Sequence, residues 1–148
     1  MQDIPSVTAK NATILYTENG ILMIRVTAPV TEHFQFAPEP YTVFPEGITV
    51  HTYRDSMVLE STLTAKFATY WESKQLWMAR YDVVASNAKG EVLNTEELYW
   101  DQGKKLIYGN DRVKITTADG VIFGDGFESD ESFNEWVVKK PIGTLYVD

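Results

Sequence analysis

The chain has 148 residues, a formal net charge of −8 and no cysteine, and its length suits one domain with a single core. The acidity argues against binding to nucleic acid, and the lack of cysteine excludes disulfides, iron–sulfur clusters and a thiol nucleophile. Apolar residues make up 44% of the chain, but apolar runs such as 21–24 are too short to cross a bilayer.

Strand-like alternation dominates the chain from its first residues. Residues 12–16 alternate, Asn19-Gly20 is a strong hairpin signal, and residues 22–28 alternate again on the returning strand. The segment 29–45 contains four prolines, which predict a crossover or an irregular edge.

Further alternating segments follow Gly47. Residues 48–50 lead to a turn at 54–56, and apolar positions alternate again through 57–67. The stretch 130–135 favours a short helix only weakly. Polar and glycine-containing turns punctuate the rest of the chain at 72–74, 87–90, 101–104 and 118–120.

A period of thirty residues links these segments. Residues 63–92 align with residues 93–122, and a weaker alignment of a third repeat places Trp136 at the position of Leu106. The matched pairs are Tyr70 with Trp100, Leu76 with Leu106, Val83 with Val113, and Gly90 with Gly120. We therefore expect stacked strand–turn–strand units with an edge strand at each end, because one unit alone cannot bury its apolar face.

Catalytic motifs are missing from the sequence. His33 and His51 are the two histidines, and neither lies in a zinc-ligand pattern. Glu96 and Glu97 are neighbours on a strand and point to opposite faces, so they cannot work as a carboxylate pair. The sequence contains neither a nucleophile elbow nor a phosphate-binding loop. It therefore predicts no enzymatic activity, no metal and no cofactor.

Two glycines interrupt the apolar segment near residue 125. Gly124 and Gly126 lie between Phe123 and Phe127, and glycine within a strand marks a bulge, a bend or a close approach. They indicate either a bend in the sheet or a groove in its inner wall.

Four segments together resemble the LptC family in its Bacteroidetes form. They are 44–47 (FPEG), 76–77 (LW), 95–101 (TEELYWD) and 124–130 (GDGFESD), and the resemblance runs from about residue 7 to residue 147.

The resemblance implies an all-β fold, an open, twisted β-jellyroll of the OstA-like type built from stacked antiparallel hairpins. It also implies a single periplasmic domain over 1–148, with residues 1–6 flexible, that carries lipopolysaccharide in its interior. Family members receive lipopolysaccharide from an inner-membrane ABC transporter and pass it to LptA by pairing edge strands. The native protein is expected to be anchored to the inner membrane, although the family's N-terminal membrane segment is absent from this sequence.

Acyl burial supplies the physical basis for this role. Lipopolysaccharide is anionic like this protein, whereas each buried methylene contributes about 0.8 kcal/mol. Lys104, Lys105, Lys139 and Lys140 are either solvated turn residues or phosphate contacts at a rim. The candidate lining residues, each otherwise an ordinary core residue, are Ile14, Leu22, Ile24, Leu59, Leu63, Phe67, Leu76, Met78, Leu106, Phe123, Gly124, Gly126 and Phe127.

The sequence leaves three alternative functions open. A structural or adhesive β-protein would have a packed core and bind partners, such as glycans, through Tyr53, Trp71 and Tyr99. A bridge segment similar to LptA would lack its own contact with the transporter. A hydrolase that uses the carboxylates near Asp125 is the third alternative.

Overall fold

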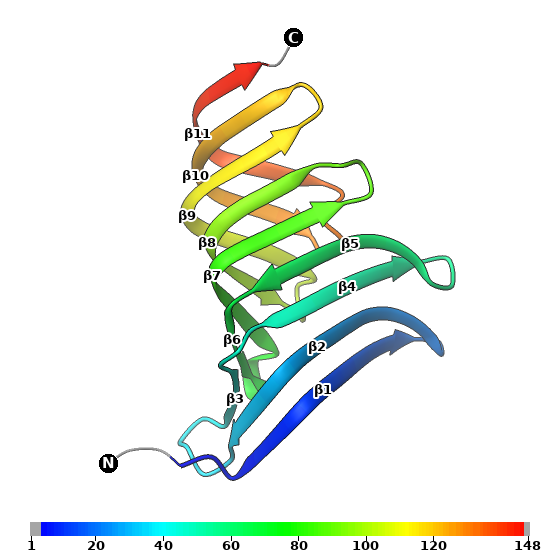
Figure 1. Cartoon of the computed structure of the whole chain (residues 1–148), viewed down its shortest axis with the longest axis vertical. Helices are drawn as coiled ribbons and strands as arrows, with labels where there is room; N and C mark the ends of the chain where they lie inside the picture. Colours follow the sequence, from blue (N-terminus) through cyan, green and yellow to red (C-terminus); the bar gives the residue numbers. More distant parts are fainter. Residues whose placement is uncertain (1–3, 147–148) are drawn as a thin grey trace.

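The computed structural model describes residues 4–146, and within them eleven strands form one antiparallel sheet (Figure 1). This confirms the expected all-β fold. The strands are β1 (Val7–Glu18), β2 (Ile21–Phe34), β3 (Tyr41–Phe44), β4 (Ile48–Arg54), β5 (Val58–Ala65), β6 (Phe67–Trp71), β7 (Leu76–Asn87), β8 (Val92–Asp101), β9 (Leu106–Thr117), β10 (Gly120–Asp130) and β11 (Trp136–Tyr146).

The strands stack along the long axis of the molecule. Their order runs from β11 through β10, β9, β8, β7, β5 and β4 to β2, and β1 pairs with the far side of β2. β3 and β6 pair with each other and link β2 to β7. In the described residues β1 and β11 each pair with one strand only, so they are the expected edge strands. They lie at opposite ends of the stack (Figure 1).

Each long strand bends near its middle, which folds the sheet into a roll with two layers. We call the line of bends the corner. Tyr81 and Asp82 adopt positive φ where the β7–β8 register slips, and Gly126 does the same in β10. The front layer contains β4, β5 and residues 12–18, 21–28, 83–87, 92–95, 113–117, 120–125 and 140–146. The back layer contains β3, β6 and residues 7–8, 32–34, 76–80, 97–101, 106–109, 127–130 and 136–138.

The outside of the corner is polar. The carboxylate of Glu96 accepts a hydrogen bond from the backbone N–H of Asp82 at 2.9 Å, which satisfies a donor that the bulge frees from the ladder. Exposed ion pairs follow the same line, and each contributes little to stability on its own. They join Lys66 to Asp82 (3.6 Å), Arg112 to Asp125 (2.7 Å) and Lys139 to Glu128 (3.0 Å).

The thirty-residue period appears in the register of the sheet. Leu63 and Leu93 both lie level with Ala85 on the inner face, and Tyr70 and Trp100 both lie level with Trp77. Trp136, however, pairs with Ser129, which pairs in turn with Ile107 and not with Leu106. The third repeat is therefore displaced by one residue in the register of the sheet.

Several local expectations are corrected. The proline-rich segment is less irregular than expected, because β2 continues to Phe34 and β3 pairs with it. Residues 131–135 form a turn and not a helix. The expectation that residues 1–6 are flexible stays a prediction: 1–3 lie outside the described residues, and the backbone N–H of Ser6 donates to the carbonyl of His33 at 2.7 Å.

Candidate binding cavity

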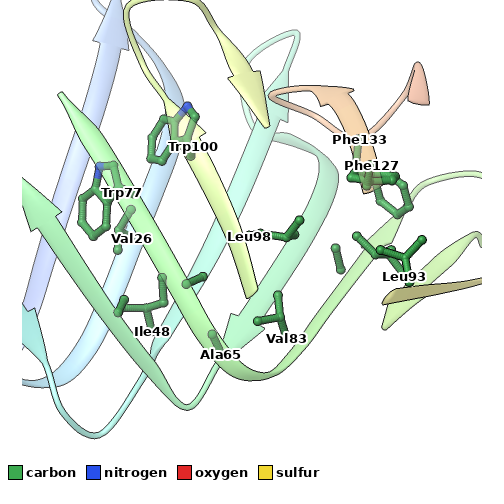
Figure 2. Close-up of a cluster of buried hydrophobic side chains, with 14 of the residues drawn as sticks. Val26, Ile48, Ala65, Trp77, Val83, Leu93, Leu98, Trp100, Phe127 and Phe133 are labelled. Atoms are coloured by element: carbon green, nitrogen blue, oxygen red, sulfur yellow. The ribbon is translucent and has the colours of Figure 1, made fainter. Parts of the chain in front are cut away.

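The two layers enclose an apolar core that contains a small cavity. Figure 2 shows residues of this core from both layers, including Leu93 from the front and Trp100 and Phe127 from the back. The cavity measures about 50 Å³ in the space open to the centre of a water molecule. Its walls are formed mainly by Ile24, Ile48, Val50, Leu63, Trp77, Ala79, Ala85, Leu93, Leu98, Trp100, Ile107, Phe127 and Phe133.

Alternation explains why these side chains point inward. On β7, Trp77 and Ala79 face the cavity, so Leu76 and Met78 between and beside them face outward. The aromatic residues pack across strands and layers. Trp77 stacks on Phe44 with ring centroids 5.1 Å apart and on Trp100 at 5.9 Å, which makes the wall at this end rigid and apolar.

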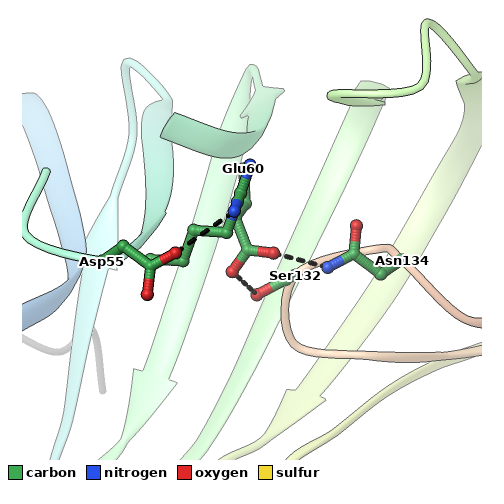
Figure 3. A network of polar contacts seen from close by, with 5 residues as sticks. Asp55, Glu60, Ser132 and Asn134 are labelled. Atoms are coloured by element: carbon green, nitrogen blue, oxygen red, sulfur yellow. Dashed lines mark hydrogen bonds and ion pairs between the residues drawn. The ribbon is translucent and has the colours of Figure 1, made fainter. Parts of the chain in front are cut away.

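The side of the roll opposite the corner, where turns of the two layers face each other, is the mouth. It is closed by contacts between the layers. The carboxylate of Glu60 on β5 accepts hydrogen bonds from Ser132 and from Asn134 at 3.3 and 2.6 Å (Figure 3). The side-chain amide of Asn87 donates to the carbonyl of Phe133 at 2.7 Å.

Two further groups of contacts bridge the mouth. The indole N–H of Trp136 donates to the carboxylate of Glu91 at 3.0 Å. Nearer the N-terminal end of the stack, the rings of Tyr16 and Trp100 meet edge to face at 5.6 Å, and Lys105 pairs with Glu18 at 3.2 Å. The interior is therefore enclosed on this side mainly by polar contacts and one aromatic pair.

Titratable groups at the mouth have altered pKa values. Burial raises the pKa of the Tyr16 phenol, which keeps it neutral at ordinary pH. For Glu91 burial acts in the same direction, but hydrogen bonds from Trp136 and Asn87 and the charge of Lys89 together lower its pKa below the usual value. Glu91 is thus ionised when it accepts the hydrogen bonds from Asn87 and Trp136 that flank the turn 131–135.

The structure places four of the proposed lining residues on the inner face. Ile24, Leu63 and Phe127 line the cavity itself. Ile14 packs against the core from β1.

Seven of the proposed lining residues lie on the outer face, so the expectation that they line the interior is corrected. Leu76, Met78 and Leu106 neighbour the inner residues Trp77, Ala79 and Ile107, and strand alternation turns them outward, although Met78 is only 7% exposed. The other four are Leu22, Leu59, Phe67 and Phe123.

Irregular positions explain three of these reversals. In β2 an extra residue, Met23, lies between Leu22 and Ile24, since Leu22 pairs with Thr17 and Ile24 pairs with Tyr16, and it is Met23 that packs against the core. In β5 an extra residue, Glu60, lies between Leu59 and Ser61, since Ser61 pairs with Thr52 and Leu59 pairs with Tyr53. Leu59 is consequently 48% exposed. Lys66 separates β5 from β6, and the alternation restarts with the buried Ala68, which turns Phe67 outward.

The two glycines do not open a groove. A Cβ atom at Gly124 would lie 2.3 Å from Cγ1 of Val138, so the space beside this glycine is filled by β11. Gly126 adopts φ +82° at the corner and lies against the aliphatic part of Lys139. Both glycines instead let β11 approach β10 closely.

The sequence contained a signal for some lining residues that were missed. Leu93 and Trp100 occupy the repeat positions of Leu63 and Tyr70, so the period itself places them on the inner face. Phe133 had no such signal, because it lies in a turn and adopts φ +55°.

Other site classes have no support in residues 4–146. These residues contain no group of three histidine or acidic side chains placed to hold a metal ion. No helix formed by them is long and apolar enough to cross a membrane.

Comparison with known proteins agrees with the fold and the apolar interior. Residues 1–146 match the family described as "Lipopolysaccharide-assembly, LptC-related". No individual curated protein gives a significant match. The chain therefore belongs to the LptC family, the periplasmic components of the bridge that transports lipopolysaccharide.

Proposed function

We propose that this chain binds lipopolysaccharide by taking its acyl chains between the two layers of the roll and passes it along the transport bridge. The observation that carries the proposal is the apolar cavity, which is lined from both layers and closed at the mouth mainly by polar contacts. Family membership supplies the identity of the lipid.

The size of the cavity sets a condition on this binding. A volume of 50 Å³ holds about four water molecules and is too small for a long acyl chain. The layers must therefore separate when a chain enters. Burial of about twelve methylenes contributes on the order of 10 kcal/mol, which exceeds the cost of breaking a few hydrogen bonds of about 1 kcal/mol each at the mouth.

Site-specific photo-crosslinking tests the proposal. A small diazirine-bearing residue is placed at Leu63, which lines the cavity, and separately at Leu76, which is the matched leucine on the outer face. After irradiation with lipopolysaccharide, we expect an adduct from position 63 and little from position 76. Adducts from position 76 alone, or from neither position, would contradict binding in the interior.

We further propose that the two edge strands are the joints of the bridge. β1 and β11 are twelve and eleven residues long, and each has one side without a strand partner among the described residues. An edge of this length can pair with a strand of another protein through backbone hydrogen bonds. Exposed Leu15 and Leu145 mark the two edges.

Crosslinking from these edges tests the partners. A photoreactive residue at Leu145 and another at Leu15 are each mixed with LptA and with the transporter. We expect one edge to capture LptA and the other to capture the transporter. Capture of neither partner from either edge would contradict pairing through the edges.

We also propose that the native protein is held at the inner membrane. This step is supported by family membership alone. Membrane fractionation of the protein expressed from its native locus tests it, and recovery wholly in the soluble periplasmic fraction would contradict it.

A further inference from the structure

Two buried hydroxyl groups lie side by side in the apolar wall of the cavity. Thr52 on β4 and Ser61 on β5 are register partners, and both line the cavity. Their side-chain oxygens are 2.5 Å apart, and the residues are 4% and 8% exposed. Each hydroxyl is thus the other's hydrogen-bond partner in a region shielded from solvent.

One hydrogen of this pair has no acceptor. Two hydroxyls carry two hydrogens, and the bond between them uses one. Within the described residues neither hydroxyl has another hydrogen-bond partner. One O–H group therefore remains free to donate.

The neighbouring side chains do not supply the missing acceptor. On one side Thr52 lies level with Ile24, which is apolar. On the other side Ser61 lies level with Asn87, whose oxygen already accepts from the backbone N–H groups of Lys89 and Glu91. The Asn87 amide donates to Glu91 and Phe133, so it offers nothing to the pair.

A second donor without a partner lies in the wall formed by the back layer. Trp77 lines the cavity and is 3% exposed, and its indole N–H has no hydrogen-bond partner among residues 4–146. The neighbouring Trp100 differs, because its N–H donates to Glu131 at 2.6 Å. The Tyr16 hydroxyl lies near the Trp77 indole, which partly offsets the rise that burial causes in the pKa of Tyr16. The two groups nevertheless do not meet hydrogen-bond geometry.

We propose that these donors select acyl chains that carry an acceptor oxygen, either a hydroxyl or an ester, over unsubstituted chains. This inference rests on the proposed function, since it concerns the same cavity. A plain alkyl chain leaves the spare O–H and the indole N–H buried without acceptors, which is unfavourable, whereas an oxygen on the chain satisfies at least one of them. Most of the remaining wall is apolar and holds the hydrocarbon, and its other polar members include Thr62, Ser129 and Glu131.

Competition binding with matched chains tests the selectivity. The probe is a fluorescent fatty acid, and the competitors are tetradecanoate, 3-hydroxytetradecanoate and 3-acetoxytetradecanoate. We expect at least one oxygenated chain to bind the wild-type protein about tenfold more tightly than tetradecanoate, which is the effect of one hydrogen bond. The arm that gains affinity identifies the hydroxyl or the ester.

Variants assign the effect to the hydroxyl pair. Thr52→Val removes the hydroxyl and keeps the branched shape of the side chain, and combining it with Ser61→Ala should abolish the preference for the oxygenated chain over tetradecanoate. Thr64→Val, on the exposed face of β5, should keep the preference. Trp77→Phe tests the second donor independently and guards against a double variant that fails to fold.

The outcomes separate this inference from the proposed function. Equal affinities of the three chains for the wild-type protein, or a preference that survives in the double variant and in Trp77→Phe, would overturn the selectivity and leave acyl binding intact. If none of the chains displaces the probe and the probe itself does not bind, both the selectivity and the proposed function are wrong.

Discussion

Replacing Gly124 by alanine tests whether close approach of β11 to β10 is what this glycine provides. The added Cβ would lie 2.3 Å from Cγ1 of Val138, 2.7 Å from the carbonyl oxygen of Lys140 and 3.1 Å from Cα of Pro141. Two of these three atoms belong to the backbone. Val138 is buried and lies level with Phe127, which is fully buried, so its side chain has no free space into which it can turn.

The size of the effect follows from this geometry. Because neither Val138 nor the backbone can yield locally, the first half of β11 must move away from β10, which loosens the packing around Phe127. Overpacking of a core typically costs about 1–3 kcal/mol, and the backbone contact places Gly124→Ala in the upper part of this range. For a chain of this size that corresponds to a fall in melting temperature of about 4–12 °C.

Gly143→Ala is the matched control. Gly143 lies on β11, level with Phe123 next to Gly124, and a Cβ there would meet nothing within 4 Å. This change should alter stability by no more than about 0.5 kcal/mol. Urea unfolding followed by tryptophan fluorescence measures both variants. If their midpoints coincide, the close approach of β11 is not what Gly124 provides.

Two further predictions concern the mouth. Glu60→Ala removes the acceptor for Ser132 and Asn134, so amide hydrogen exchange in the turn 131–135 should become about tenfold faster. Glu46→Ala, at an exposed position, is the control. Equal exchange rates in the two variants would contradict the role of Glu60 in closing the mouth. The pKa of Glu91 is lowered on folding, so its contribution to stability is complete above the ordinary carboxyl pKa and is lost as the pH falls through the lower, folded value. Between about pH 5 and pH 3 the urea midpoint of the wild-type protein should therefore fall more than that of Glu91→Gln. Parallel curves for the two proteins would show that Glu91 is not coupled to folding.

The sequence predicted the hairpins well because turns and the thirty-residue period are local signals. Asn19-Gly20 forms the turn between β1 and β2, and Gly90 and Gly120 both adopt positive φ in equivalent turns. The repeat also placed Leu93 and Trp100 level with their counterparts. These features depend on neighbouring residues and not on how the sheet bends.

The inner face was harder to predict because side chains alternate with a period of two. One extra residue reverses the faces of the positions on one side of it relative to the other, as Glu60 does for Leu59 and Lys66 does for Phe67. The charges at these two positions, within otherwise apolar alternation, are the only local hint of a break. Where the bends fall along each strand is set by pairing with strands far away in the sequence.

The contrast between the mouth and the interior bears on how a transfer protein can release its cargo. The groups that close the mouth, such as Glu60, Asn134 and Lys105, exchange hydrogen bonds with water when the layers part, so opening costs little. The apolar walls, in contrast, gain free energy with every methylene they cover. Under the proposed function, an empty roll would therefore close and hide its walls, while a long chain would hold it open. Because the same weak contacts would re-form once the chain leaves, closure would help to expel the last part of the chain toward the next segment of the bridge.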